Sequence, residues 1–197
     1  MPYQPYKTVI RTANPKQLVT NCVSIYPLYI PMLKQMAASA QLIAYNQFYS
    51  TANQSIITLN TPIALTYTNS GPSKDGITYS GSQITVGRTG AYFVSVSVQI
   101  GRLVGNTSST CIVWFRVNGV DVPASASNIT MPPTISATLL TVTIMLQLTG
   151  GQYIEVMYGN EDAAGHTSAV AVPAQVSPYA APLSPSIITD VFYMGQG

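Results

Sequence analysis

The fold of this 197-residue chain is decided by GAYFVSVSVQI, residues 90–100. Tyr92, Val94, Val96, Val98 and Ile100 alternate with Ser95, Ser97 and Gln99, a period of two that is typical of a β-strand with one buried face. Successive side chains of a strand point to opposite faces, so the apolar series enters a core and the polar series lies on the other side. We therefore predict a long strand at 90–101.

Short runs rich in Val, Ile, Thr and Tyr continue on both sides of this segment, separated by turn residues. Asn118-Gly119 lies between two such runs, and a type I′ hairpin turn needs two residues that tolerate positive φ. We predict strands at 55–59, 63–67, 76–80, 82–87, 90–101, 110–117, 120–123, 136–148, 151–158 and 186–194. Ten strands without helices between them predict an all-β, antiparallel jelly-roll sandwich.

Residues 1–50 differ in texture from the rest of the chain. Five prolines interrupt them, and their charges are all basic: Lys7, Arg11, Lys16 and Lys34. Residues 33–45 (LKQMAASAQLIAY) lack Gly and Pro and predict one short helix. We therefore predict an N-terminal anchoring arm at 1–50 and a jelly-roll domain at 51–197. The basic residues are too sparse for a polybasic tail, so we expect the arm to dock on neighbouring subunits rather than on nucleic acid.

The composition favours a protein whose surface is covered by partners. Charged residues make up 7% of the chain, against about 25% in an average soluble protein, and hydrophobic residues make up 47%. The alternative is an extracellular domain that is solvated by hydroxyls and amides. The sequence has no run of 18 apolar residues, so we expect no membrane-spanning helix. Residues 1–17 have no apolar stretch after their basic residues, so they do not predict a secretory signal.

Catalytic chemistry has little support in the sequence. His166 is the single histidine, and no serine elbow or paired carboxylate accompanies it, so we expect an exposed loop histidine and no enzyme. Glu161 and Asp162 are too few for a calcium site and predict solvated loop charges. We predict no catalytic, cofactor-binding or metal-binding residues.

Three other features allow more than one interpretation. We expect Trp114 to pack in the core, with a ligand-binding role as the alternative. Cys22 and Cys111 are far apart and outside any metal-binding spacing, so they predict free thiols, with a mutual disulfide as the alternative. Residues 169–185 carry no charge and predict a long loop or extended edge that lies on protein.

The order of motifs in the body resembles the complement-head and tumour-necrosis-factor-like jelly roll. These motifs are GITYSG at 76–81, ITV at 84–86, TGAYFVSVS at 89–97, RVNGV at 116–120, LTGGQYIEV at 148–156 and VFYMG at 191–195. Gln152 stands where that family often has Asp. The resemblance covers residues 54–197 and implies a ten-stranded jelly roll that commonly forms compact trimers, in secreted ligands as well as in virion and bacteriophage surface proteins.

The resemblance and the basic arm together suggest a structural virion protein. We expect a minor capsid, vertex (penton) or capsid-surface subunit that forms a homo-oligomer, either a trimer or a pentamer, and docks on neighbouring capsid proteins. One alternative is a head domain that binds a host receptor or a glycan through loops at 102–109, 124–135 and 159–185. Another is a secreted trimeric ligand.

Overall fold

The computed structural model describes residues 44–196, except 59, 75, 106, 162–165 and 179. The chain divides into two units after residue 42, and all the described strands belong to the second. The predicted helix at 33–45 lies outside the described residues, apart from its last two positions. Of these, Tyr45 begins strand β1 (Tyr45–Ser50), which pairs with β14 (Ile187–Gly195). The boundary predicted at residue 51 is therefore wrong, because the sandwich already includes β1.

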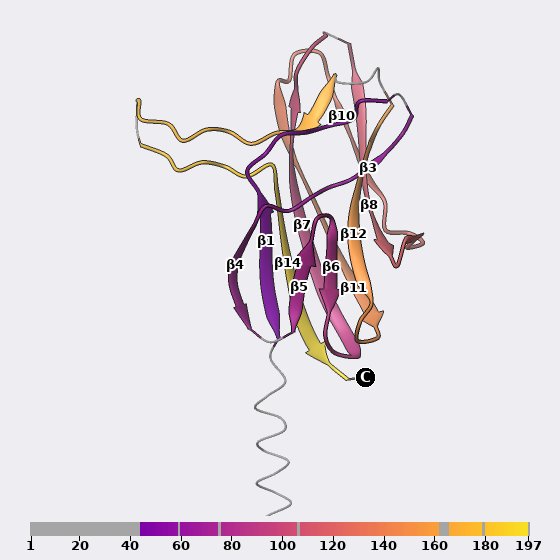
Figure 1. Cartoon of the computed structure of the whole chain (residues 1–197). Helices are drawn as coiled ribbons and strands as arrows, with labels where there is room; N and C mark the ends of the chain where they lie inside the picture. Colours follow the sequence, from indigo (N-terminus) through magenta and orange to yellow (C-terminus); the bar gives the residue numbers. More distant parts are fainter. Residues whose placement is uncertain are drawn as a thin grey trace, which may run out of the picture. The chain divides into compact units, whose positions relative to one another are not determined.

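All the regular structure in the described part of the chain is β, arranged as two antiparallel sheets (Figure 1). Sheet A contains β1, β2 (Gln54–Ser55), β4 (Asn69–Lys74), β7 (Gly90–Arg102), β11 (Ala137–Leu148), β13 (Thr167–Ala169) and β14. Sheet B contains β3 (Ile63–Ala64), β5 (Ile77–Ser80), β6 (Gln83–Val86), β8 (Ser109–Val117), β9 (Val120–Asp121), β10 (Ser127–Met131) and β12 (Tyr153–Asn160). The predicted all-β antiparallel sandwich is confirmed.

Strand β7 organises sheet A. It pairs with β11 along one edge, and with β14 and then β13 along the other. β14 in turn pairs with β1, and β1 pairs with the edge strand β4. Sheet B runs in the order β10-β8-β12-β6-β5, while β9 returns from β8 and β3 pairs with the far end of β12.

The core lies between the two sheets, and β7 contributes the apolar series predicted for it. Tyr92, Val94, Val96, Val98 and Ile100 are each 0% exposed. Facing side chains come from sheet B and include Val113, Phe115, Ile154, Val156 and Tyr158. The Tyr92 hydroxyl donates a hydrogen bond to the Arg88 carbonyl at 2.8 Å, and burial raises the pKa of this phenol above its ordinary value.

The predicted hairpin at Asn118-Gly119 is confirmed. Both residues have positive φ, at 50° and 78°, and the turn joins β8 to β9 with Val117 opposite Val120. This register places Arg116 opposite Asp121, on the face of sheet B that points away from the core.

The described residues form fourteen strands rather than ten, and the four additional strands fall outside the predicted ranges. These are β1, β4, β10 and β13. The predicted strands at 55–59 and 63–67 shorten to β2 and β3, which have two residues each. β10 and β13 lie inside the segments 124–135 and 159–185 that were predicted as loops.

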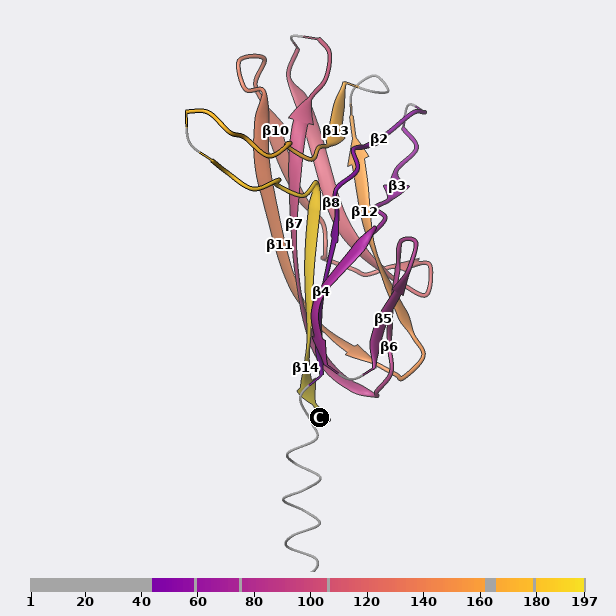
Figure 2. The ribbon, with the colours of Figure 1, turned by 60° about the vertical axis from the view of Figure 1, so that its left-hand side comes forward.

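Residues 170–178 and 180–186 form a hairpin between β13 and β14, which we call the 170–186 hairpin. Two isolated antiparallel bridges hold its strands together, Val172 to Ser184 and Gln175 to Ala181. The segment is extended, as predicted, but only its base lies on its own protomer, since the rest of the hairpin projects away from the body in both views (Figures 1 and 2). The side chain of Val176 near its end is 91% exposed.

Candidate functional site on the outward face of sheet A

The outward face of sheet A consists of the side chains that alternate with the buried series on four neighbouring strands. Its members are Leu139, Thr141, Thr143, Met145 and Gln147 on β11, Ala91, Phe93, Ser95, Ser97 and Gln99 on β7, Ile188, Asp190, Phe192 and Met194 on β14, and Tyr45, Gln47 and Tyr49 on β1. Asp190 is the single carboxylate in this set, and the set contains no Lys or Arg. The face is therefore nearly uncharged.

Three aromatic rings cluster at one end of this face. The Phe192 ring on β14 lies 6.3 Å from the Tyr45 ring and 6.4 Å from the Phe93 ring, measured between centroids. Phe192 is 42% exposed and Met194 is 61% exposed. Their surfaces are apolar and point away from the protomer's own core, so they favour contact with another apolar surface.

The β11 side of the face carries two exposed apolar side chains, Leu139 and Met145, among the polar side chains of Thr141, Thr143 and Gln147. Leu139 and Met145 are 60% and 57% exposed on a regular strand. Between them, the Thr141 hydroxyl shares a 3.0 Å hydrogen bond with the Ser97 hydroxyl on β7. This hydroxyl pair can be buried with part of its hydrogen-bonding capacity already satisfied.

Asp190 lies beside a hollow of about 250 Å³, which is lined by Tyr45, Asn46, Gln47, Pro72, Asp190 and Phe192. The Gln47 side-chain amide donates to the Asp190 carboxylate at 2.9 Å. A partner that covers this face must desolvate the carboxylate, with Gln47 as the neighbour that already binds it.

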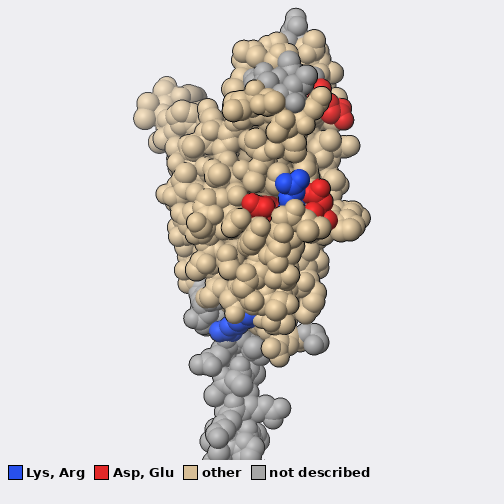
Figure 3. All heavy atoms as spheres, turned by 45° about the vertical axis from the view of Figure 1, so that its right-hand side comes forward, with Lys and Arg blue, Asp and Glu red and all other residues tan. Residues whose placement is uncertain are grey.

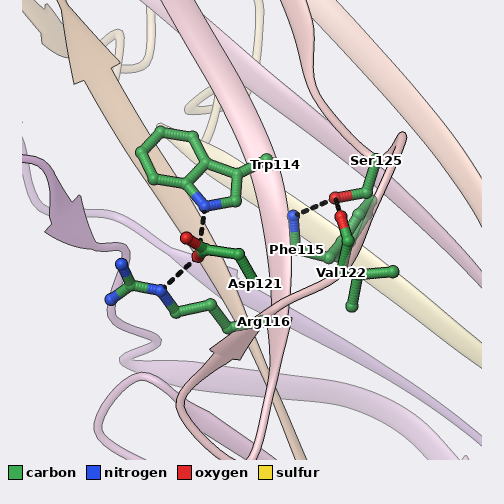
Figure 4. A network of polar contacts seen from close by, with 6 residues as sticks. All are labelled: Trp114, Phe115, Arg116, Asp121, Val122 and Ser125. Atoms are coloured by element: carbon green, nitrogen blue, oxygen red, sulfur yellow. Dashed lines mark hydrogen bonds and ion pairs between the residues drawn. The ribbon is translucent and has the colours of Figure 1, made fainter.

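The outward face of sheet B has a different chemistry. Trp114 Nε1 and Arg116 Nε both donate to Asp121 Oδ1, at 2.7 Å and 2.6 Å (Figure 4). These two hydrogen bonds lower the pKa of the Asp121 carboxyl below its ordinary value, and the bond from Arg116 has the larger effect. Seen from this side, a group of acidic and basic side chains lies near the middle of a surface that is otherwise mostly uncharged (Figure 3).

The prediction that Trp114 packs in the core is wrong. Its strand alternates, and Cys111, Val113 and Phe115 point inward while Trp114 lies partly buried on the outward side. The sequence did contain the signal for this position. Arg116 belongs outside and Trp114 precedes it by two residues, which puts both on the same face of a strand.

Of the three loop residues His166, Glu161 and Asp162, the structure describes the first two. His166 is partly buried rather than exposed, and its Nδ1 is buried without a hydrogen-bond partner in the described residues. Glu161 is exposed, whereas Asp162 lies outside the described residues. The described part of the chain contains no group of three or more His, Cys, Asp or Glu side chains placed to hold a metal ion. Nor does any helix in that part have the length and apolarity needed to cross a bilayer.

Cys111 is a buried free thiol, while Cys22 lies outside the described residues. The Cys111 sulfur lies 3.4 Å from Thr167 Oγ1. The same oxygen accepts hydrogen bonds from Asn160 Nδ2 and the Tyr158 hydroxyl, both at 3.0 Å. Thr167 belongs to sheet A and the other three residues to sheet B. The network therefore connects the two sheets and has no access to a substrate.

The arrangement of the strands matches a protein of known structure. The crystal structure of murine APRIL at pH 5.0 aligns with a TM-score of 0.50 and 14% sequence identity, covering 76% of this chain and 98% of that chain. The fold is a tumour-necrosis-factor-like jelly roll. Two further crystal structures of murine APRIL, at pH 8.5 and pH 8.0, give TM-scores of 0.48 and 0.47 at 13% and 11% identity, and each alignment covers 77% of this chain and 99% of the other. No family model and no curated protein matches the sequence.

Proposed function

We propose that this TNF-like jelly roll is a non-enzymatic structural subunit that assembles with copies of itself through the outward face of sheet A. The observation that carries the proposal is the exposure of Leu139, Met145, Phe192 and Met194 on a face with one carboxylate. Exposed apolar side chains that share one face of a sheet are costly in water and are typical of an interface.

The geometry of the face suits this role. It is built on paired strands, so its backbone groups are already hydrogen-bonded and only side chains have to be desolvated on association. Burying apolar surface stabilises a contact by about 25 cal/mol per Å², and a stable interface buries about 1,200–2,000 Å² in total. Sheet A supplies neighbouring strands of up to 13 residues for such a contact.

More specifically, we propose that the assembly is a trimer or a pentamer in a virion, as a minor capsid, vertex or capsid-surface subunit. The low charge content of the chain supports a protein whose surface is covered by neighbours. The basic residues between Lys7 and Lys34 support an anchor that docks on adjoining capsid proteins.

The first test is the native mass of the full chain and of residues 44–197, measured by light scattering after size exclusion over a range of concentrations. We expect one oligomer for both, because sheet A is complete in the shorter protein. A trimer favours a capsid-surface subunit, and a pentamer favours a vertex. Monomers at every concentration would contradict self-assembly, and incorporation of the shorter protein into particles would contradict an anchoring role for residues 1–43.

A second candidate function is a head domain that binds a receptor or a glycan, and the outward position of Trp114 favours it. An indole beside the Arg116 guanidinium and the Asp121 carboxylate offers an apolar surface with donors and acceptors at its edge. A glycan array probed with the wild-type chain and with Trp114→Ala tests this function. Binding that Trp114→Ala abolishes would support it, whereas no binding by the wild-type chain would contradict it.

A further inference from the structure

The 170–186 hairpin has an unusual surface for a segment that projects from a protein. Its sequence, VAVPAQVSPYAAPLSPS, contains no charged residue. Val176 is 91% exposed and Leu183 is 40% exposed. Projecting segments normally carry charged residues that keep them in solvent, so an uncharged apolar hairpin is better suited to contact with protein.

The base of the hairpin is fixed to the body by hydrogen bonds at both ends. On the first side, the Val170 amide donates to the Gln99 carbonyl at 2.8 Å and the Ala171 amide donates to Asn53 Oδ1 at 2.8 Å. On the second side, the Ser186 hydroxyl donates to the Ala52 carbonyl at 2.7 Å. These bonds determine the direction in which the hairpin leaves the body.

That direction is the outward side of sheet A. The Ser184 hydroxyl donates to the side chain of Gln99, which belongs to the outward face of β7, at 2.9 Å. A Cβ added to Gly101, two residues further along the same face, would lie 2.5 Å from the Val170 side chain, so Val170 covers this face. Figure 2 shows the hairpin crossing in front of β7 and β11.

The hairpin is long and its chemistry favours packing over strand addition. Eight residues lead from position 170 to position 178, which corresponds to about 25 Å of extended chain. Pro173, Pro178, Pro182 and Pro185 remove backbone donors, so its edges are poor templates for another strand. They also restrict the unbound backbone, and this reduces the entropy lost when the hairpin docks.

We propose that the 170–186 hairpin packs against a second copy of this chain, over the nearly uncharged outward face of the neighbour's sheet A. The inference rests on the proposed function, because a neighbour that covers this face lies on the side to which the hairpin projects. Its uncharged surface matches Leu139 and Met145, which lie exposed on β11. The hairpin adds contact area beyond what the flat face alone can bury.

The test compares two exposed valines in the full chain. Val176→Asp places a charge on the hairpin, and Val120→Asp places the same charge on the β8–β9 hairpin of sheet B, where Val120 is 69% exposed. We expect Val176→Asp to weaken association by about tenfold or more and Val120→Asp to change it by less than about twofold, measured by light scattering over a concentration series. Neither side chain is buried, so neither variant should unfold.

A second measurement follows the hairpin directly. A thiol introduced by Val176→Cys in a Cys22→Ser background should react with a maleimide about tenfold more slowly in the assembled protein than in protein diluted to monomer. The matched variant Val120→Cys should react at the same rate in both states. Cys111 is buried and contributes little to the signal.

The outcomes separate the inference from the proposed function. If the wild-type chain is monomeric at every concentration, both are wrong. If it assembles but Val176→Asp associates like wild type and Val176→Cys is not protected, the hairpin inference alone is wrong. This second result would mean that the hairpin stays in solvent or binds a different protein.

Discussion

The two outward faces of the sandwich differ although both are antiparallel sheets over the same core. Sheet A presents exposed apolar side chains with Asp190 as its single carboxylate, whereas sheet B presents Trp114 in a hydrogen-bonded group with Arg116 and Asp121. On sheet B the polar atoms at the centre of the face satisfy one another. On sheet A the exposed apolar side chains cannot satisfy one another by hydrogen bonds in this way. Under the proposed self-assembly, sheet A is the face that a neighbouring copy covers and sheet B is the face left outside that contact.

The largest expected effect comes from a charge on the face of sheet A. Met145→Lys should weaken self-association by about 30-fold or more, or about 2 kcal/mol, because an ammonium group would have to be desolvated in an apolar contact. The matched variant is Val120→Lys on sheet B, where Val120 is likewise exposed, and it should change association by less than about twofold. Sedimentation equilibrium measures both constants. Equal effects of the two variants would remove the distinction between the faces.

The next largest effect is on the stability of the fold rather than on self-association. Thr167→Val removes the acceptor of hydrogen bonds from Tyr158 and Asn160, and Thr167 is 0% exposed. The free energy of unfolding should fall by about 1–3 kcal/mol, since buried donors would lose their acceptor. Thr78→Val on an exposed position of β5 is the control and should change stability by less than about 0.5 kcal/mol. Urea denaturation of the monomeric Met145→Lys background gives both values, and equal values would mean that the network does not hold the sheets together.

A smaller effect concerns the carboxylate of each face. Asp190→Asn should strengthen self-association by about three- to tenfold, because the neutral amide is less costly to desolvate when a partner covers it. Asp121→Asn on sheet B should leave association unchanged. The same sedimentation measurement applies, and a weaker Asp190→Asn assembly would show that the carboxylate pairs with a cation across the contact.

The smallest effect is a pH dependence confined to sheet B. The pKa of Asp121 is lowered in the folded protein. The carboxylate therefore contributes fully to stability at a pH above its pKa in the unfolded chain, and this contribution is lost as the pH falls through its pKa in the folded protein. The contribution is small because the side chain is 59% exposed. Emission from Trp114, the single tryptophan, should nevertheless change with a midpoint below the ordinary range of an aspartate. The transition should be missing in Asp121→Asn, and its persistence there would assign it to another group.

Much of the fold could be predicted because several local patterns agreed. The alternation around Val94 and the Asn118-Gly119 turn each allow one conformation, and the structure has both. The strands that were missed have weak patterns. β4 contains Gly71 and Pro72 and survives as an edge strand, where a missing backbone donor costs little.

β1 was missed for a different reason. Its inward residues are Asn46, Phe48 and Ser50, so one apolar side chain in three points to the core. The Asn46 amide is accommodated by a hydrogen bond to the Ile77 carbonyl at 2.9 Å, a contact between segments 31 residues apart. Such tertiary compensation leaves no local signal.

The candidate site was predictable only in part. Alternation shows that Ser95, Ser97 and Gln99 leave the core, but the apolar exposure of the face comes from β11 and β14, which flank β7 in space. Strand order in a sheet depends on long-range pairing, and the sequence does not state it locally. In the run from Cys111 to Phe115 every residue is apolar, so Arg116 is the one residue of this strand whose charge marks the outward side on which Trp114 lies.

The pairing of β1 with β14 also determines how the body responds to a mechanical load. Tyr45 faces Phe192, so the chain enters β1 at the same end of the sandwich at which β14 finishes. A force applied to the two ends of residues 44–197 therefore acts across the strands and opens this pair like a zipper, one residue at a time. A force between residue 44 and the 170–186 hairpin at the opposite end acts along the strands and loads all the hydrogen bonds of the pair together. The body should therefore yield at low force between its termini and resist strongly along its length.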